Sequence, residues 1–250
     1  MEMILNNLQL SNGKRVNYDF QSGSVTAICG SCRREVMNAI IHESDGVLFG
    51  ANASLCPISY VPLKKKIDTN TLAKEELLLT FHRNNVEFDE EAVAKIFKIL
   101  KVELNILNKA ICDLTAREQK ALLIANALIA DSEVIVLDSI ENGMHYKTKE
   151  NLKKYLKTLA NDFDKTIVII TNNLTFMFDL ADNYLLVDEK KHFAVGTKKD
   201  FYSPTLYCCL DVPKIVEFTN YINNAKNRNI KEYIELKELL KAIYRDIENK

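Results

Sequence analysis

The segment that decides the fold is Leu114–Ile140, "LTAREQKALLIANALIADSEVIVLDSI". Its first half places apolar residues at helical spacing, and its second half contains Val134–Asp138, an apolar run that ends in a carboxylate. A continuous apolar run is typical of a parallel strand with both faces covered. Thr115 followed three residues later by Glu118 is a capping-box pattern, with Asp113 as an alternative cap. The segment therefore predicts a helix followed by a buried strand of an α/β domain.

The same alternation of strand and helix patterns continues on both sides of this segment. Apolar or alternating runs predict strands within residues 1–20, 23–30, 46–50, 58–63, 133–140, 165–173 and 183–196. Helical spacing predicts helices within residues 33–43, 71–108, 116–130, 148–162 and 173–182, and again beyond residue 200. Asp89 is a candidate cap inside the long helical stretch. This order favours an α/β domain with a parallel sheet.

The overall composition excludes some classes of function. The chain has 250 residues, with 33 basic and 34 acidic side chains and a formal net charge of −1. A near-neutral balance argues against a general nucleic-acid binder, which needs a strongly basic face. The sequence has no run of about eighteen apolar residues, so no transmembrane helix is expected. The N-terminus lacks the pattern of a signal peptide, which favours a cytoplasmic location.

Two of the six cysteines, Cys29 and Cys32, form a C-x-x-C pair. This spacing suits a redox or metal pair, but no second C-x-x-C and no nearby histidine pair completes such a site. The four histidines are scattered and show no metal-ligand spacing. Reduced cysteines with a structural role are therefore the favoured interpretation.

Three stretches in a fixed order resemble the nucleotide-binding domain of ABC-type ATPases: "LTAREQK", "VIVLD" and "IVIITNN". In that family an L-S-G-G-Q signature opens a helix, a strand ending in D-E follows, and a later strand ends in T-H. The run "SVTAICG" stands where the strand before the phosphate loop belongs. The resemblance implies a P-loop-NTPase-like parallel sheet with an antiparallel edge sheet in residues 1–200, and a helical insert at about 70–115.

The C-terminal part narrows the resemblance to the ATP-binding subunits of energy-coupling factor transporters, which serve vitamin and metal uptake. In those subunits a G-T-x-x-x-x-F stretch is followed by L-D-x-P and a C-terminal helical extension. The matching residues here are Gly196, Thr197, Phe201, Leu210, Asp211 and Pro213. By this resemblance, residues 201–250 form a small helical extension and a candidate dimerisation element.

The candidate phosphate loop departs from the family pattern. ATP-binding loops of this fold need glycines and a lysine, because backbone N–H groups wrap the phosphates and the lysine reaches the β- and γ-phosphates. This chain has no G-K-[ST] after the strand, and its shorter loop consists of Gly30, Ser31, Cys32, Arg33 and Arg34. The two arginines bring positive charge to a helix start, which can attract an anion. The alternative is a plain strand-to-helix turn.

The positions that the family uses for hydrolysis are also changed. The resemblance makes Asp138 a candidate Mg²⁺ ligand, but Ser139 stands where the general-base glutamate belongs. A serine hydroxyl cannot accept a proton from water near neutral pH. Asn172 replaces the switch histidine and cannot titrate. ATP and Mg²⁺ are therefore weak cofactor candidates, with no cofactor as the alternative, and we expect hydrolysis to be lost.

The signature-like helix start is also altered. It comprises Leu114, Thr115, Ala116, Arg117, Glu118 and Gln119. Leu114, Thr115 and Gln119 persist in kind, while Ala116 and Arg117 replace the two glycines of the family. An arginine at the second position fills space through which a signature loop approaches a partner's γ-phosphate. Alternatively, Arg117 itself meets a phosphate, or it is an exposed side chain on a capped helix.

Three functions are consistent with these patterns. The first is a degenerate, catalytically inactive ABC transporter ATP-binding subunit. It would pair with a homologous active ATPase subunit and lie on the cytoplasmic face of the membrane, beneath a transmembrane subunit of an energy-coupling factor transporter. The second is a divergent but active ATPase that draws its lysine from Lys64, Lys65 or Lys66. The third is a non-transport scaffold or regulator, since fold alone does not fix function.

Overall fold

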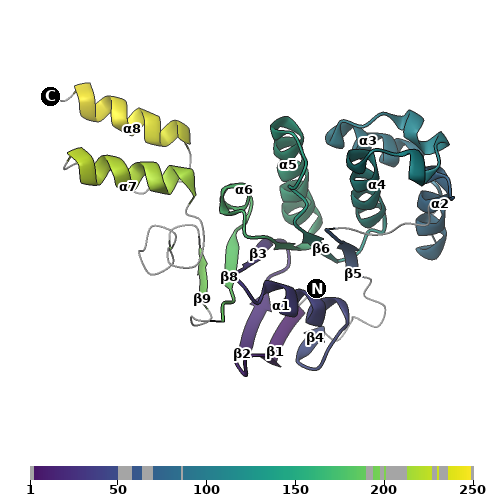
Figure 1. Cartoon of the computed structure of the whole chain (residues 1–250), viewed down its shortest axis with the longest axis horizontal. Helices are drawn as coiled ribbons and strands as arrows, with labels where there is room; N and C mark the ends of the chain where they lie inside the picture. The colour runs from purple at the N-terminus through teal and green to yellow at the C-terminus, as the bar shows by residue number, and fades with distance from the viewer. Residues whose placement is uncertain are drawn as a thin grey trace.

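The structure is a computed structural model of the chain (Figure 1). It describes residues 3–49, 58–63, 70–85, 87–189, 194–197, 200, 213–226, 230 and 236–248. Some residues of the sequence analysis lie outside these ranges, namely Lys64, Lys65, Lys66, Phe201, Leu210 and Asp211.

The described residues contain two β-sheets. Their strands are β1 (Met3–Gln9), β2 (Arg15–Phe20), β3 (Val25–Cys29), β4 (Val47–Phe49), β5 (Ile58–Val61), β6 (Val134–Asp138), β7 (Thr166–Ile170), β8 (Asn183–Leu186) and β9 (Ala194–Thr197). The central sheet has the order β5-β6-β7-β3-β8-β9 and is parallel except for the antiparallel pair of β8 and β9. The smaller sheet, β2-β1-β4, is antiparallel. The expected parallel sheet with an antiparallel edge sheet is therefore confirmed.

Of the described helices, α1, α4 and α5 pack against strands of the central sheet (Figure 1). The helices are α1 (Arg33–Ile41), α2 (Ala73–Arg83), α3 (Glu90–Leu100), α4 (Ala116–Ile129), α5 (Tyr146–Phe163), α6 (Leu174–Phe178), α7 (Lys214–Lys226) and α8 (Leu236–Glu248), with the 3-10 helices η1 (Leu104–Asn108) and η2 (Ile111–Asp113). The helices α2, α3 and α4 lie together beside β5 (Figure 1). All five residues of β3, β6 and β7 are buried, as the continuous apolar runs predict.

The alternation of side chains along β7 shows why the central strands are apolar throughout. Ile167 and Ile169 belong to a buried cluster with residues of α4 and α5. Val168 and Ile170 belong to a second cluster, shared with α1 and the antiparallel sheet. Because each face of the strand meets a separate apolar layer, a polar residue on either face would be buried without a partner.

A local cap and a backbone bridge hold the segment that contains α2 and α3. The carboxylate of Asp89 accepts a hydrogen bond from the N–H of Ala92 at 3.0 Å, as the sequence predicts for the start of α3. Leu72 and Ala110 form an isolated antiparallel bridge across the base of the insert. The segment between these two residues, which contains α2 and α3, therefore begins and ends at neighbouring positions.

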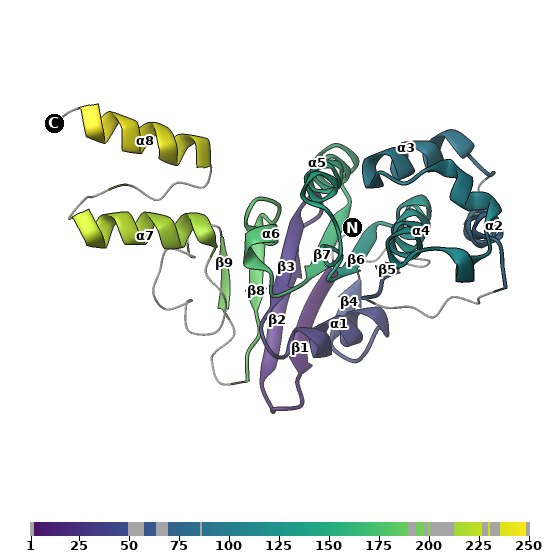
Figure 2. The same cartoon turned by 45° about the horizontal axis from the view of Figure 1, so that its top comes forward.

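Figures 1 and 2 show α7 and α8 side by side beyond β9. Val216 of α7 packs in a third buried cluster with residues of α6, including Met177. No helix among the described residues is long and apolar enough to span a bilayer.

Candidate functional site

The candidate site residues converge at one edge of the central sheet. The strands β6, β7 and β3 are adjacent and parallel, so their carboxyl ends meet at the same edge. Gly30 follows β3, Asp138 ends β6 and Asn172 follows β7. Ligands of open α/β sheets bind at this kind of edge. The structure thus brings together the phosphate-loop, magnesium and switch positions that the sequence predicts.

Hydrogen bonds to neighbouring strand ends close the candidate phosphate loop. The N–H of Gly30 donates to Oδ1 of Asn172 at 2.9 Å. The N–H of Cys32 donates to the carbonyl of Val187, which follows β8, at 3.1 Å. Gly30 has φ +103°, and a Cβ at this position would lie 2.2 Å from the Val187 oxygen. Two amides that a phosphate cradle would offer are therefore already paired within the protein.

The two arginines lie at the start of α1, as the sequence predicts, but they occupy different environments. Nη1 of Arg33 donates to the carbonyl of Gly30 at 2.8 Å. Its Nε is buried and has no hydrogen-bond partner among the described residues. Arg34 is exposed on α1. The Arg33 guanidinium thus folds back over the loop instead of extending from it.

Acidic residues lie close to the same loop. Oγ of Ser31 accepts a hydrogen bond from the N–H of Glu189 at 3.0 Å. Burial raises the pKa of the Cys32 thiol, and the carboxylates of Glu35, Glu189 and Asp188 raise it further. The same negative charges oppose a polyanion at this position.

Asp138 and Ser139 interact with each other at the end of β6. Asp138 is 4% exposed, and its Oδ1 accepts a hydrogen bond from Oγ of Ser139 at 2.9 Å. The N–H of Ser139 donates to the carbonyl of Ile170 at 2.9 Å. Ser139 has φ +49°, a left-handed conformation that is sterically costly for residues other than glycine. The residue at the general-base position is therefore used to hold Asp138 in place.

The residues at this edge do not fit a Mg–ATP site of the usual kind. No lysine occurs among residues 30–34, although such a site needs one to reach the β- and γ-phosphates. One oxygen of Asp138 is engaged by Ser139, and Asn172 binds the loop amide that would face a phosphate. We derive no hydrolytic step through this site.

A buried carboxylate that the sequence analysis did not identify lies in the loop after β6. Glu141 is 2% exposed, and its Oε1 accepts a hydrogen bond from Oγ1 of Thr171 at 2.5 Å. Its Oε2 has no hydrogen-bond partner among the described residues. Buried carboxylate oxygens are normally paired. The sequence gives little signal of this, because a glutamate three residues after a strand resembles an ordinary surface loop.

Lys120 links the start of α4 to the same loop. Its Nζ donates to the backbone carbonyls of Ser139 at 3.1 Å and of Asn142 at 2.8 Å. Burial lowers the pKa of Lys120, whereas the charges of Glu141 and Asp138 raise it. Lys120 therefore links α4 to the loop after β6 through hydrogen bonds within the protein, and no nucleotide is needed for this link.

The signature-like helix start has the predicted capping box. Oγ1 of Thr115 accepts from the N–H of Glu118 at 3.3 Å, and the N–H of Thr115 donates to Oε2 of Glu118 at 2.7 Å. Oγ1 of Thr115 also donates to Oε2 of Glu118 at 2.7 Å, and this bond and the one from the Thr115 N–H lower the pKa of Glu118. The Glu118 carboxylate occupies the position where the helix dipole would otherwise favour an external anion.

The flanking signature residues make internal contacts. Nη2 of Arg117 donates to the carbonyl of Lys101, which follows α3, at 2.8 Å. Nε2 of Gln119 donates to the carbonyls of Ile111 and Leu114 at 3.0 and 3.2 Å. Ala116 is exposed, and Leu114 is buried. Arg117 therefore braces the end of α3 in this structure.

The sequence of the chain is similar to those of several known proteins. No protein-family model matches the chain. A putative ABC transporter ATP-binding protein of Clostridium tetani is 30% identical over 154 residues, which cover 62% of this chain and 34% of that relative. The chain thus spans about a third of that protein's length. An energy-coupling factor transporter ATP-binding protein of Oenococcus oeni is 25% identical over 263 aligned positions, covering 94% of this chain and 90% of the relative.

Solved structures show the same fold at lower identity. An ATP-binding subunit of an ABC transporter has a TM-score of 0.70 at 12% identity, covering 88% of this chain and 99% of that chain. A dimeric bacterial ABC transporter cassette has a TM-score of 0.66 at 18% identity, covering 79% and 99%. The chain is therefore a homologue of ABC transporter ATP-binding proteins and has the fold of an ABC ATPase cassette.

Proposed function

We propose that this chain is a non-hydrolysing ATP-binding-type subunit of an energy-coupling factor transporter. It pairs with a homologous active ATPase subunit on the cytoplasmic face of the membrane, under a transmembrane subunit. The relative from Oenococcus oeni, an energy-coupling factor transporter ATP-binding protein, covers 94% of the chain and supports this class. The residues of this chain that match the G-T-x-x-x-x-F and L-D-x-P stretches of energy-coupling factor ATP-binding subunits also support this class.

The observation that supports loss of hydrolysis most directly is the closed phosphate loop. The amides of Gly30 and Cys32 are paired with Asn172 and Val187, and Arg33 binds the Gly30 carbonyl. Nucleotide would have to break these contacts and enter a region with several carboxylates. In the proposed pair, the chain instead offers its α4 start to the nucleotide of the active subunit.

Titration calorimetry with Mg–ATP and the purified chain tests the first half of the proposal. We expect no binding heat at millimolar ATP, because the loop has neither free cradle amides nor the lysine. Micromolar binding that disappears in Arg33→Ala or Arg34→Ala would contradict the proposal. It would make the start of α1 a new phosphate site.

Turnover by the co-expressed pair tests the second half. Asp138→Ala in this chain should leave ATP hydrolysis by the pair unchanged, because this chain's own site is not used. Arg117→Glu in the same chain should lower turnover, because it places a negative charge where the partner's nucleotide is expected. Failure to recover any ATPase partner or membrane subunit would contradict the assignment.

A divergent, active ATPase is the second candidate, and Glu141 is the observation that favours it. Its buried, half-paired carboxylate follows Asp138 by three residues at the same sheet edge. If Glu141 serves as a proton acceptor in place of the missing glutamate, the chain alone hydrolyses ATP. Glu141→Gln and Asp138→Ala would then each abolish that turnover. No turnover by the chain alone rejects this candidate.

A further inference from the structure

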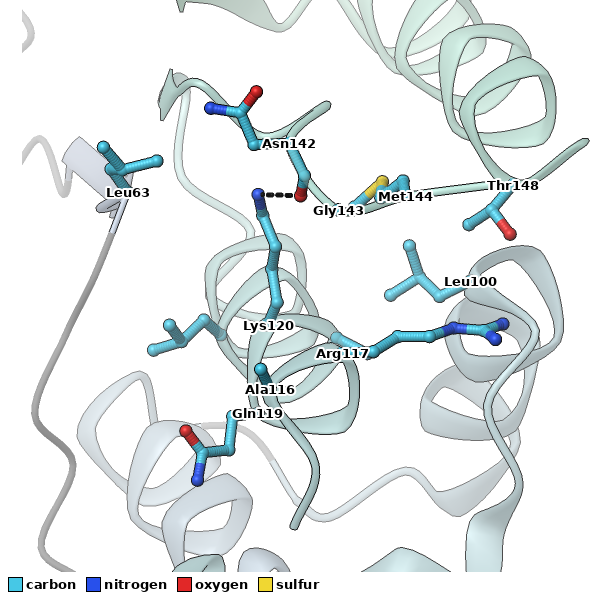
Figure 3. A pocket seen from close by; sticks show the side chains of 12 residues that line it. Leu63, Leu100, Ala116, Arg117, Gln119, Lys120, Asn142, Gly143, Met144 and Thr148 are labelled. Carbon is cyan, nitrogen blue, oxygen red and sulfur yellow. Dashed lines mark hydrogen bonds between the residues drawn. The ribbon is translucent and has the colours of Figure 1, made fainter. Parts of the chain in front are cut away.

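The loop after β6 turns two backbone carbonyls toward one side chain of α4. Nζ of Lys120 donates to the carbonyl of Ser139 at 3.1 Å and to the carbonyl of Asn142 at 2.8 Å. The N–H of Asn142 donates to the Ser139 carbonyl at 3.2 Å, which closes the turn between these two residues. Figure 3 shows the Lys120 side chain extending from α4 to the Asn142 carbonyl. Carbonyl oxygens that share one partner atom in this way are ligands that suit a cation.

The same loop contains a buried carboxylate. Glu141 lies in the sequence between the two residues that supply the carbonyls, and it is 2% exposed. Its Oε1 accepts a hydrogen bond from Thr171, but its Oε2 has no hydrogen-bond partner among the described residues. Moving a carboxylate out of water is costly unless an opposite charge compensates it. Glu141 therefore favours a positive charge beside this loop.

Lys120 supplies that positive charge. Burial lowers the pKa of Lys120, whereas the charges of Glu141 and Asp138 raise it, Glu141 more than Asp138. Oδ1 of Asp138 already accepts a hydrogen bond from Ser139. Glu141 is therefore the carboxylate for which the ammonium matters most.

We propose that the loop after β6 forms a cation site in which the tethered ammonium of Lys120 is bound by two backbone carbonyls and by the charge of Glu141. The ligand class of this site is a primary ammonium, which combines N–H donors for the carbonyls with a charge for the carboxylate. Lys120 is thus a positioning residue that holds the first turns of α4 against the loop. This role does not depend on whether the chain pairs with an ATPase subunit.

The site also connects α4 with the candidate phosphate loop. Oγ1 of Thr171 donates to Glu141, and the next residue, Asn172, accepts from the N–H of Gly30. Loss of the Lys120 ammonium should therefore speed amide hydrogen exchange at the start of α4 and in the loops after β6 and β7.

Chemical rescue of the variant Lys120→Ala tests the site in the full chain. The substitution removes the ammonium and most of the side chain, and n-propylammonium restores both as a free molecule. A cavity of about 840 Å³ that Lys120 lines gives this cation access (Figure 3). At about ten times its dissociation constant, propylammonium should shift the unfolding equilibrium of Lys120→Ala about tenfold toward the folded state and restore slow hydrogen exchange. The parent chain should not respond.

Two compounds separate binding at the site from a general solvent effect. Tetramethylammonium has the charge but no N–H donor, and n-propanol has the size but no charge. Neither should shift the urea unfolding of Lys120→Ala at constant ionic strength. Equal effects of the three compounds, or no effect of propylammonium at any concentration, would overturn the proposal.

A second substitution tests Glu141 as the counter-ion. Glu141→Gln keeps the shape of the side chain and removes its charge. The double variant, Lys120→Ala with Glu141→Gln, should be more stable than Lys120→Ala, because no uncompensated carboxylate remains inside the protein. Propylammonium should bind the double variant about tenfold more weakly. A double variant that is as unstable as Lys120→Ala, and is rescued equally well, would refute the role of Glu141.

Lys165→Ala is the matched control. Nζ of Lys165 donates to the carbonyl of Asp131 at 2.9 Å and pairs with its carboxylate at 2.7 Å. The Asp131 side chain is 82% exposed, so water solvates its charge when the lysine is removed. Propylammonium should therefore not rescue Lys165→Ala. Equal rescue of the two alanine variants would contradict a specific site.

Glu141→Gln alone tests the proposal if Lys120→Ala does not fold. The pKa of Lys120 should fall in this variant, because the charge that raises it is gone. The ¹³Cε signal of lysine in labelled protein measures this pKa, and its absence in Lys120→Arg assigns it. An unchanged pKa of Lys120 in Glu141→Gln would overturn the proposal.

Discussion

At the scale of single residues, Gly30 shows how the turn after β3 depends on the absence of a side chain. Gly30→Ala should lower the free energy of unfolding by at least about 2 kcal/mol, because the new Cβ would lie 2.2 Å from the Val187 oxygen. Gly13→Ala is the control, because Gly13 also has a positive φ, +78°, but open space around it. Its cost should be roughly 1 kcal/mol, from backbone strain alone. Equal losses in urea unfolding would contradict the clash.

Cys29 gives a pH-dependent prediction at the same scale. Burial raises the pKa of its thiol from 9.0 to about 12. Between these values the unfolded chain loses the thiol proton and the folded chain keeps it, so rising pH favours unfolding. Cys29 should therefore cost about 1.4 kcal/mol of stability per pH unit above pH 9.

The comparison with Cys29→Ala isolates this thiol from other groups. Burial also raises the pKa of Tyr184, but that residue is the same in both proteins. Urea unfolding at pH 7, 9 and 10 should show a steeper loss of stability in the parent chain than in Cys29→Ala. If the free energy of unfolding falls equally with pH in the two proteins, the Cys29 thiol has the same pKa in the folded and the unfolded chain.

Some site contacts could be predicted from the sequence and others could not. The bond between Thr115 and Glu118 was predictable, because a capping box joins residues three apart in the chain. The bond between Gly30 and Asn172 joins residues 142 positions apart, and it depends on the order of strands in the sheet. Glu141 was missed because its burial results from the packing of the loop, and the local sequence does not encode that packing.

At the scale of elements, the start of α4 depends on its cap. Thr115→Ala removes the hydroxyl that accepts from the N–H of Glu118. We expect a loss of about 1 kcal/mol in the free energy of unfolding. Thr115→Ser keeps the acceptor and should restore most of this loss, and urea unfolding of both variants measures the difference. A serine variant as unstable as the alanine variant would assign the effect to the lost methyl group.

Acid should weaken the same element. The bonds from Thr115 hold the pKa of Glu118 below its ordinary value of 4.5. A lowered folded-state pKa stabilises the fold above the ordinary value, and this contribution is lost as the pH falls below it. Glu118→Gln should therefore show less loss of stability than the parent chain when the pH is lowered from 6 to 3. An identical loss in both proteins would contradict this role of the carboxylate.

The helices and strands were the features of the chain that the sequence predicted best. β6 and β7 are continuous apolar runs because both faces are covered, and that pattern is visible without knowledge of their neighbours. The caps Asp89 and Thr115 marked the starts of α3 and α4 correctly. The strand order could not be predicted from periodicity, since a buried run does not specify which strand lies beside it. The resemblance to a known family implied a parallel sheet with an antiparallel edge sheet, and the order β5-β6-β7-β3-β8-β9 comes from the structure.

At the scale of the whole molecule, the proposed pairing makes α7 and α8 the surface to test. They expose Tyr221 at 67% and Leu240 at 42%, while Val216 and Leu239 are buried. Exposed apolar side chains gathered on one helical unit mark an interaction surface. We therefore expect α7 and α8 to contribute to the contact with the second ATP-binding subunit. Lysine at Tyr221 and Leu240 would put charge into that apolar interface.

The variant Tyr221→Lys with Leu240→Lys should reduce the complex with the co-expressed subunit to separate chains. The measurement is molar mass by light scattering after size-exclusion chromatography. Phe163→Lys is the matched control, because Phe163 is 62% exposed but lies at the end of α5. Unchanged thermal unfolding of the double variant would show that the substitutions act on association and not on folding. An intact complex in the double variant would place the pairing surface elsewhere, and equal dissociation by Phe163→Lys would mean that added surface charge alone disrupts it.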